Sequence, residues 1–423
     1  MLLIALLSPL AHAHATALLE GLDVAPHALG GLAVETSFGL LWSESADPEM
    51  RWLCHEAVTA PDAIMTPRYS VSVDGTMLAA VPALEQTRDL DRPVYRTTDR
   101  CAWDPVVGLD GVVISDVAYD RSDAQFAVAI SADLADGAEN QIYRSQDAGQ
   151  SFLSVAGAEQ RLFRTVAWGP DGHVWVAAAW YATPGAWLLH SPDRGVTWTE
   201  ITLPVPTLDD DIDVDVLAAG TGAAIVAMGP FGADAVMRVH ADGTIEALAE
   251  PGAELTDAAV DDDGTVWLAG DGARFWSFVD GTLTELPDAP EGQGLSSVDG
   301  DLRLATRARQ LGTQVALSTD GGAHFETEFH LSALQPPPTC PEDSPITTFC
   351  APLWSALEAR LPLPPGGEDT GEGDDGGDDG DDGGDDGGGD TATAPEPKDG
   401  GCGGGGGAAM LLLPLLLPWR RRP

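Results

Sequence analysis

Short runs of apolar and β-branched residues alternate with polar positions along most of the chain, and they predict strands. Clear pairs of runs are residues 113–119 with 125–130, and residues 165–168 with 173–178. The second pair is joined by Gly169-Pro170-Asp171-Gly172, a combination typical of tight turns. No convincing amphipathic helix precedes residue 351, so the pattern predicts an all-β fold up to that point.

A turn motif recurs where one strand ends and the next begins. It reads Ser-x-Asp-x-Gly-x-x-aromatic in three copies, and a degenerate first copy has Thr97, Asp99 and Cys101 at the Ser, Asp and Gly positions. The full copies consist of Ser145, Asp147, Gly149 and Phe152; of Ser191, Asp193, Gly195 and Trp198; and of Ser318, Asp320, Gly322 and Phe325.

Each residue type in the motif has a physical reason. Ser and Asp side chains bond to nearby backbone and hold a tight turn, and Gly adopts a positive φ without steric cost. The aromatic side chain then packs between neighbouring sheets. The motif resembles the Asp-box, or bacterial neuraminidase repeat, of sialidases, sortilin-type receptors and photosystem II assembly factors. The resemblance implies a β-propeller in which these turns are structural.

Counting strand-rich units predicts the number of blades. Seven units, each about forty to fifty residues apart, match one four-stranded blade each. Weaker units keep a turn without the full motif, as at residues 240–244. A six-bladed ring with an N-terminal extension is the alternative. The seven units are residues 28–60, 64–107, 112–156, 162–202, 213–249, 255–287 and 294–332.

Charge excludes some partners. The chain of 423 residues has a formal net charge of −46, with 67 acidic and 21 basic residues. Such a field repels nucleic acid and anionic lipid, so neither is an expected partner. We expect no cofactor and no defined metal site. The acidic residues Asp209, Asp210, Asp211, Asp213 and Asp215 form a solvated connection or, alternatively, a weak Ca²⁺ site.

The N-terminus and the cysteines indicate export. Residues 1–15 contain an apolar run followed by overlapping small-x-small sites, the pattern of a signal peptide, although the usual positive charge is missing; a buried first strand is the alternative. Exported proteins favour disulfides, and of the three possible connectivities among four cysteines we prefer Cys54 with Cys101 and Cys340 with Cys350. Residues 16–335 then form the propeller. Residues 336–362, with a short helix over 353–361, close the domain.

The C-terminus is predicted to be an anchor on a spacer. Residues 363–401 are rich in Gly, Asp and Glu and predict a disordered linker, with weak Ca²⁺ binding as an alternative. Residues 402–423 contain Cys402, an apolar run and an arginine cluster, Arg420, Arg421 and Arg422. This order is similar to the C-terminal sorting signals of myxobacterial surface proteins. It implies processing at Cys402 by sorting machinery and retention at a bacterial cell surface or outer membrane. The alternative is a simple C-terminal membrane anchor in which Cys402 has no role.

Catalytic residues are not identifiable from the sequence. Sialidases use a Phe-Arg-Ile-Pro signature, an arginine trio, a Tyr–Glu nucleophile pair and an Asp acid/base, whereas this chain offers only Phe163-Arg164-Thr165. Only Tyr69 and Tyr181 lie outside strand or motif positions. We therefore lean toward a protein that is not an enzyme, since a fold alone does not specify an activity.

The sequence thus predicts a non-catalytic surface binding or adhesion module whose ligand is a glycan or another protein. Membrane contact is expected only through the tail. Trp180, Tyr181 and Trp187 flank a Pro-Gly turn and are candidate ligand contacts, or else packing residues of a blade. The first alternative is a diverged sialidase-like exo-glycoside hydrolase, which needs paired carboxylates and arginines at the ring centre. A periplasmic assembly factor is the second.

Overall fold

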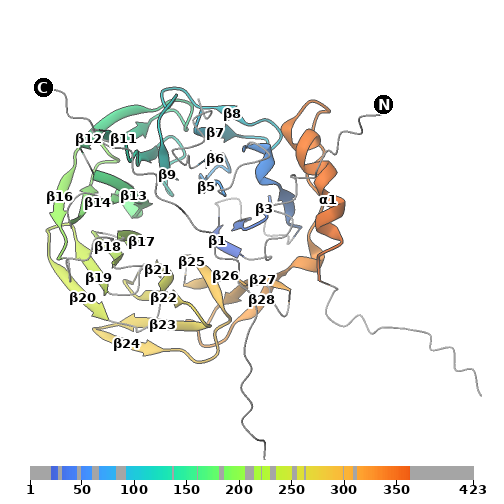
Figure 1. The fold of residues 1–423 in the computed structure, drawn as a ribbon. Helices are drawn as coiled ribbons and strands as arrows, with labels where there is room; N and C mark the ends of the chain where they lie inside the picture. Colours follow the sequence, from blue (N-terminus) through green and yellow to red (C-terminus); the bar gives the residue numbers. More distant parts are fainter. Residues whose placement is uncertain are drawn as a thin grey trace, which may run out of the picture. The chain divides into compact units, whose positions relative to one another are not determined.

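Seven four-stranded sheets are arranged around a common centre as a β-propeller (Figure 1). Each sheet takes four strands that are consecutive in sequence, so each blade is an antiparallel meander. The computed structural model describes residues 21–26, 31–44, 49–59, 66–81, 92–135, 138–159, 161–180, 185–204, 214–220, 222–228, 235–249, 255–261, 263–298, 300–307 and 312–362.

The strands follow the ring in chain order, and the first strand of every blade is the innermost. Blade 1 contains β1 (Gly21–Pro26), β2 (Leu32–Thr36), β3 (Gly39–Trp42) and β4 (Arg51–Leu53), and blade 2 contains β5 (Arg68–Val71), β6 (Met77–Ala80), β7 (Val94–Thr97) and β8 (Asp104–Pro105). Blade 3 contains β9 (Ile114–Tyr119), β10 (Ala127–Ser131), β11 (Glu139–Ser145) and β12 (Leu153–Glu159), and blade 4 contains β13 (Arg161–Trp168), β14 (Val174–Trp180), β15 (Ala186–Ser191) and β16 (Thr199–Thr202). Blade 5 contains β17 (Val214–Gly220), β18 (Ala223–Met228), β19 (Ala235–His240) and β20 (Ile245–Ala249). Blade 6 contains β21 (Leu255–Val260), β22 (Val266–Gly270), β23 (Arg274–Val279) and β24 (Thr282–Glu285), and blade 7 contains β25 (Gly292–Val298), β26 (Asp301–Thr306), β27 (Thr313–Ser318) and β28 (Glu326–His330).

The all-β class and the seven-bladed ring predicted from the sequence are confirmed, and the six-bladed alternative is not observed. The blade limits agree closely with the expected units from blade 2 onward. Blade 1 is the exception, because its inner strand β1 begins at Gly21, before the expected limit at residue 28. The sequence of β1, Gly21–Pro26, begins with Gly and ends with Pro, and it gave no clear strand signal.

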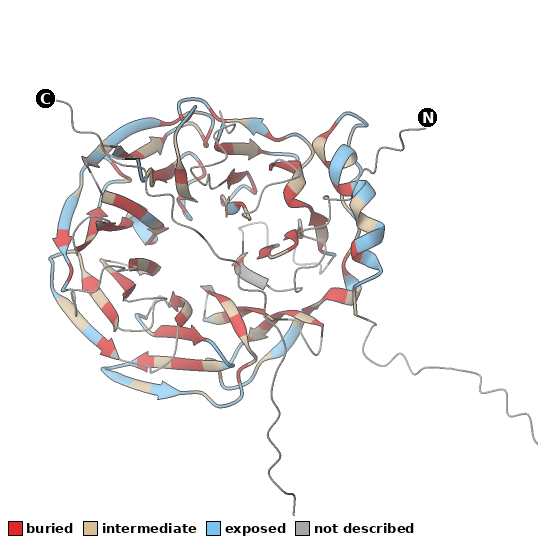
Figure 2. Ribbon diagram, in the orientation of Figure 1, coloured by how far each residue is buried: buried red, intermediate tan, exposed pale blue. Residues whose placement is uncertain are grey.

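The hydrophobic core is a series of clusters between adjacent blades. Second strands such as β6, β10 and β22 are buried along their whole length (red in Figure 2). One cluster joins Leu78 of blade 2 to Val117 of blade 3, and it includes Phe152, which is 1% exposed. Trp198 packs in the same way in the cluster between blades 3 and 4, and Phe325 meets the ring of Phe275 edge-on at 5.4 Å. The motif aromatics therefore join blades 3, 4 and 7 to the blade that precedes each of them.

The ring is closed by the segment that follows blade 7, and this is where the expected disulfide pairing is wrong. Cys54 pairs with Cys350, and Cys101 pairs with Cys340. Gln335 also pairs with Arg51 at the outer edge of blade 1. The local pairing expected from the sequence fails because ring closure brings residues far apart in the chain, with separations of 296 and 239 residues, next to each other.

The expected C-terminal helix is present, with shifted limits. A π-helical turn (Ile346–Cys350) leads into α1 (Ala351–Glu358), which lies against blade 1 (Figure 1). The Trp354 ring is 6.0 Å from the Trp52 ring, and Leu357 is buried. Three short 3-10 turns complete the described elements, at His55–Ala57, Pro170–Gly172 and Leu331–Ala333. Within the described part of the chain, no helix is both long and apolar enough to span a bilayer.

Candidate functional site

The inner strands surround a central cavity of about 820 Å³. Its wall is made largely of small side chains, including Ala118, Ala167, Ala218 and Ala258, which leave space at the ring centre. Charged and polar side chains from several blades also line it. Those used below are Glu35, Arg68, Tyr69, Ser70, Ser115, Asp116, Arg121, Arg164, Thr165, Asp215, Thr256, Asp257 and Gln293.

β-Bulges place several of these polar residues. In β9, β21 and β25 the pairing with the second strand skips one residue, which is Ser115, Thr256 and Gln293 respectively. In β13 the register shifts between Phe163 and Val166, so Arg164 lies in the irregular segment. A bulge turns a side chain out of the regular alternation. All four residues line the cavity, so the bulges add polar groups to those that the wall already contains.

Two of the carboxylates join neighbouring blades. Asp116 of β9 accepts the N–H of Val166 of β13 at 3.0 Å and the N–H of Val117 at 2.8 Å. Asp257 of β21 repeats this arrangement, with the N–H of Leu295 of β25 at 2.6 Å and that of Ala258 at 2.8 Å. Both oxygens of each carboxylate are therefore engaged by backbone amides.

Other polar side chains make the same connection between other blades. The Ser70 hydroxyl accepts the N–H of Tyr119, and the Thr165 hydroxyl accepts the N–H of Val216, each at 2.8 Å. Together with Asp116 and Asp257 they form an inter-blade polar belt, which satisfies inner-strand amides that the sheets leave unpaired. Much of the polarity at the ring centre is thus structural.

Burial changes the acidity of Asp116. Desolvation raises its pKa to about 6, because the charged form loses hydration inside the ring. The two backbone N–H donors and the positive charge of Arg68 oppose this change, while the negative charge of Asp215 adds to it. The pKa of Asp116 therefore approaches neutrality.

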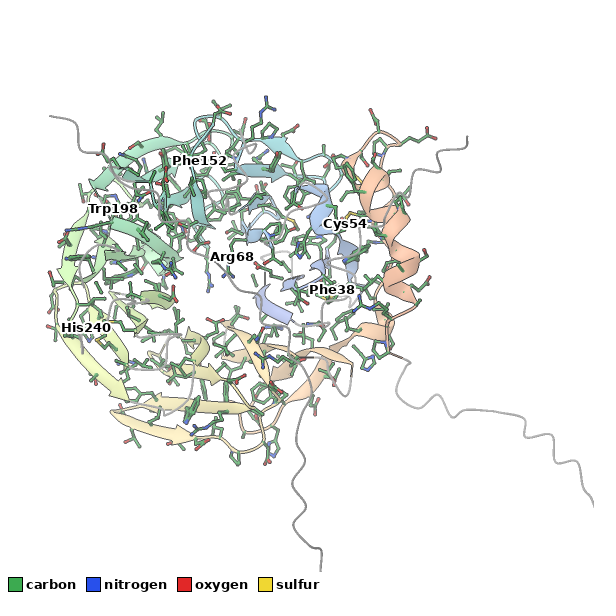
Figure 3. The ribbon with its side chains drawn as sticks, viewed as in Figure 1. Phe38, Cys54, Arg68, Phe152, Trp198 and His240 are labelled. Atoms are coloured by element: carbon green, nitrogen blue, oxygen red, sulfur yellow. A yellow bond between two sulfur atoms is a disulfide. The ribbon has the colours of Figure 1, made fainter. Side chains whose placement is uncertain are left out.

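Arginines supply positive charge to the cavity. Arg68 lies at the start of β5, with its side chain 58% exposed and Nη1 3.7 Å from Glu35 Oε1. Figure 3 shows it at the inner edge of the ring. Arg164 on β13 and Arg121, in the turn after β9, are exposed as well. Since guanidinium groups offer several fixed donors, the cavity can bind a ligand rich in acceptor oxygens.

Tyr69 and Glu35 reproduce the residue types of a sialidase nucleophile pair but not its geometry. The Tyr69 hydroxyl lies 3.2 Å from Nδ1 of His55, whose Nε2 lies 3.1 Å from the Thr36 carbonyl oxygen. It is the Tyr69 backbone N–H, at 3.3 Å, that donates to Glu35. Burial raises the pKa of Tyr69 well above its usual value. A buried, neutral phenol directed at His55 is poorly placed for nucleophilic attack.

The sequence motif residues lie away from the cavity, in turns between the third and fourth strands of four blades. Ser191 Oγ donates to Asp193 Oδ1 and accepts the N–H of Gly195, each at 2.8 Å, and Asp193 also accepts the N–H of Thr197 at 2.8 Å. The turn at residues 145–152 is built alike.

The turns at the two ends of the series vary this design. Hydrogen bonds from His324 lower the pKa of Asp320 to about 2. In the degenerate turn Asp99 accepts the N–H of Cys101 at 2.9 Å, and the positive φ falls on Arg100. In all four turns the Asp side chain accepts a backbone N–H, and at the degenerate turn that residue is Asp99.

The aromatic contact candidates are only partly described. The Trp187 ring lies 4.3 Å from the guanidinium carbon of Arg161 and packs against the cluster between blades 3 and 4. Tyr181 and the Trp180 side chain lie outside the described residues, as do Asp209 to Asp211, Cys402 and the arginine cluster at 420–422. Among the residues that are described, no group of three or more His, Cys, Asp or Glu could hold a metal ion.

The sequence analysis missed most of the cavity. Ser115 and Asp116 are neighbours in β9, whereas Asp257 lies in β21, and no local motif indicates that these strands share a cavity. The available signal was weak: a polar residue near the start of inner strands that are otherwise apolar, as in Ile114–Tyr119 and Leu255–Val260.

Comparison with known proteins supports the fold. No family model and no curated protein matches the chain. A virginiamycin B lyase from Staphylococcus aureus is similar in structure, with a TM-score of 0.50, 12% identity, and coverage of 69% of this chain and 94% of that one. A structure from a study of two prolyl endopeptidases gives a TM-score of 0.50 at 14% identity, covering 75% of this chain and 49% of that one.

A GH74 xyloglucanase from Xanthomonas campestris gives a TM-score of 0.49 at 16% identity, over 73% of this chain and 53% of that one. At such low identities, structural likeness shows the propeller fold alone.

Proposed function

We propose that this chain is a non-catalytic binding module of the Asp-box type, which holds its ligand at the central cavity. One observation carries the proposal: Asp116 and Asp257 accept backbone amides of neighbouring blades, and Arg68 and Arg164 add exposed guanidinium groups to the same wall. Carboxylates that hold blades together cannot also transfer protons without weakening the ring. Exposed guanidinium groups, in contrast, are suited to recognition.

The ligand is a glycan or a surface protein that presents acceptor oxygens. Arg68 and Arg164 are donors only, and Ser115, Thr256 and Gln293 add smaller polar groups around them. Alanine walls leave room for a bulky group. The wall carries both signs of charge, since Arg68, Arg121 and Arg164 line it together with four carboxylates, so the guanidinium groups offer donors to a ligand without making the cavity positive as a whole.

The proposed setting is the exterior of a bacterial cell. In this proposal residues 1–15 direct export, residues 363–401 act as a spacer, and Cys402 with the terminal arginines anchors the protein. Two disulfides connect blades 1 and 2 to the segment that follows blade 7, and such bonds support the location of the protein in an oxidising compartment. Finding the mature chain free in the periplasm would instead favour the assembly-factor alternative.

A glycan array with the full-length chain tests the binding proposal. We expect specific binding that weakens at least about tenfold, or about 1.4 kcal/mol, in Arg68→Ala or Arg164→Ala. Arg360→Ala is the matched control, because Arg360 is an exposed arginine beyond the end of α1. Equal binding by all four proteins would place the ligand elsewhere.

A diverged exo-glycoside hydrolase is the second candidate. The pKa of about 6 at Asp116, beside arginines at the ring centre, favours it, and the buried Tyr69 hydroxyl opposes it. A fluorogenic sialoside assay separates the two candidates. Turnover by the wild-type chain that is lost in Asp116→Asn, while the variant remains folded, would replace the binding module with an enzyme.

A further inference from the structure

Gln293 is a residue of the cavity wall whose amide has its orientation set by a neighbour. It is half-buried at the bulge of β25. Its side chain meets Arg307, which follows β26, and Nε of Arg307 lies 2.9 Å from the amide atom that Nη2 also contacts. Because an arginine side chain has donors and no acceptor, that atom is the carbonyl oxygen Oε1. Gln293 therefore turns its –NH2 group away from Arg307.

Arg307 is itself held in place from two blades. Nη1 donates to Asp271, in the turn between β22 and β23, at 2.8 Å, and to Glu291, just before β25, at 2.7 Å. The Arg307 backbone N–H also donates to the Glu291 carbonyl, at 3.1 Å, and the side chain is only 18% exposed. If the Gln293 amide rotated by 180°, its own donors would face those of a fixed guanidinium. The orientation of the amide is therefore determined by its surroundings.

The junction of blades 6 and 7 thus places a donor beside an acceptor. The Gln293 –NH2 group has two N–H bonds on the side turned away from Arg307, and Gln293 lines the cavity, so we assign these donors to the cavity. Thr256 donates its hydroxyl hydrogen to the carbonyl of Gly292, the residue before Gln293, at 3.2 Å. The Thr256 oxygen therefore acts as an acceptor. Neighbouring hydroxyl groups of a sugar, each of which donates and accepts, match such a pair.

The charge of the wall argues against an anionic ligand. The described lining has four carboxylates and three guanidinium groups: Glu35, Asp116, Asp215 and Asp257, with Arg68, Arg121 and Arg164. An anion would also approach a chain whose formal charge is −46. Hydroxyl groups are less costly to desolvate than an ion, and they use donors and acceptors alike. The wall is therefore better suited to an uncharged group.

We propose that the cavity binds an uncharged sugar through its hydroxyl groups, and that Gln293, oriented by Arg307, is a residue that selects it. This inference rests on the proposed binding function and specifies its ligand class. Gln293 is the specificity residue, because its –NH2 group contacts the sugar. Arg307 is a positioning residue, since it acts through Gln293.

A glycan array with the full-length chain tests the ligand class. Each neutral glycan is paired with the same glycan carrying a terminal sialic acid. We expect at least about tenfold stronger binding of the neutral member. Because the recognised group has no charge, its binding should change by less than about twofold between about 0.05 M and 0.5 M NaCl.

Variants of Gln293 test its role on the same neutral glycans. Gln293→Ala removes the donors, and Gln293→Glu replaces the –NH2 group with an oxygen, so each should weaken binding at least about tenfold. Gln146→Glu is the matched control, because it makes the same change of charge at an exposed position in the motif turn of blade 3. Its binding should equal that of the wild type. Circular dichroism of each variant establishes that it is folded.

Variants of Arg307 separate positioning from general stability. Arg307→Met frees the amide to rotate and should weaken binding about threefold or more, whereas Arg307→Lys keeps a donor toward Oε1 and should restore most of it. In the Gln293→Ala background, Arg307→Met should have no further effect on binding. Equal losses in both backgrounds would show that Arg307 does not act through Gln293.

Three further results would overturn the inference. Preference for the sialylated member of each pair would make the ligand class wrong while leaving a binding module. Neutral glycan binding that is unchanged in Gln293→Ala would remove Gln293 from recognition and also leave the binding module. A wild-type chain that binds no glycan would overturn this inference together with the glycan form of the proposed function.

Discussion

At the residue scale, polar side chains in this propeller mostly serve the backbone. Asp116 holds an amide of the next blade, and Ser191 holds an amide within its own turn. Carboxyl groups in the two settings, between blades and within a motif turn, differ in pKa. Asp116 is desolvated, so its pKa rises to about 6, whereas Asp320 accepts several hydrogen bonds at the surface, so its pKa falls to about 2.

The raised pKa of Asp116 predicts a pH effect on stability. The folded-state pKa lies above the unfolded value of about 3.9, so the folded chain binds more protons between about pH 4 and pH 6. This group therefore lowers the free energy of unfolding as pH rises through that window. The Asp116→Asn variant should lack this pH-dependent decrease in the free energy of unfolding, which amounts to up to about 3 kcal/mol.

Urea unfolding of both proteins at several pH values measures this difference directly. Subtracting the variant from the wild type cancels opposing groups such as His190, whose pKa burial lowers to about 4. Parallel stability curves for the two proteins would contradict the assignment.

A second residue-scale prediction concerns the motif turns. Ser191 is fully buried, and its hydroxyl bonds both Asp193 and the N–H of Gly195. Ser191→Ala leaves that N–H unsatisfied, and we expect the free energy of unfolding to fall by about 1–3 kcal/mol. Thr202→Ala, at an exposed position on the outer strand of the same blade, should change it by less than about 0.5 kcal/mol. Equal effects would mean that the turn is not a specific source of stability.

At the element scale, each blade depends on its neighbours. Arg96 donates to the Ala148 carbonyl of the next blade at 2.6 Å, and Arg144 donates to the Arg194 carbonyl in the same way. In blade 4 the corresponding position is His190, which stacks on Trp175 at 4.1 Å and contacts Nδ1 of His173 at 2.9 Å. A single blade has no core of its own, since the apolar clusters lie between blades.

The inter-blade arginines therefore predict a local effect. Arg144→Met keeps an unbranched apolar side chain but removes the guanidinium, which lies over the Phe126 ring and donates to the Arg194 carbonyl, and we expect a loss of about 1–2 kcal/mol of stability. Hydrogen exchange should increase at the turn of residues 191–197 more than in blade 7. Uniform protection throughout the ring would show that this bond does not couple blades 3 and 4.

At the scale of the whole molecule, ring closure is the main structural problem. Blade 1 and blade 7 each consist of strands from one part of the chain, so no strand is shared across the junction. β1 packs against β25 and β26, and the closing segment adds the Gln335 pairing and both disulfides. Cys54–Cys350 is buried, while Cys101 and Cys340 are partly exposed.

Removing the disulfides tests this closure. Each bond closes a long loop, which in the chain-entropy model contributes about 2–5 kcal/mol. The pair Cys54→Ala with Cys350→Ala should lower Tm by several degrees and expose the amides of β1 and β25 to exchange first. Blade 4 serves as the internal reference, because it lies away from the junction. Faster exchange in blade 4 than in β1 would contradict a closing role.

The sequence by itself determined the repeating elements. Alternation marked strands such as 165–168 and 173–178, and the Ser-x-Asp-x-Gly turns marked where third strands end, because both signals depend on contacts within a few residues. From these the seven blades followed. The positive φ at Gly149, where a side chain would also meet the Tyr119 hydroxyl, is one example of such a local requirement.

Only the tertiary structure decided which distant residues meet. It brought Cys350 to Cys54, where a local partner had been expected, and it placed Asp116, Arg68 and Arg164 around one cavity. Local patterns cannot encode these contacts, because each blade contributes one strand to the centre and the neighbours across it are set by the closure of the ring. The repeat could therefore be predicted from the sequence, whereas the cavity forms only when the blades close into a ring.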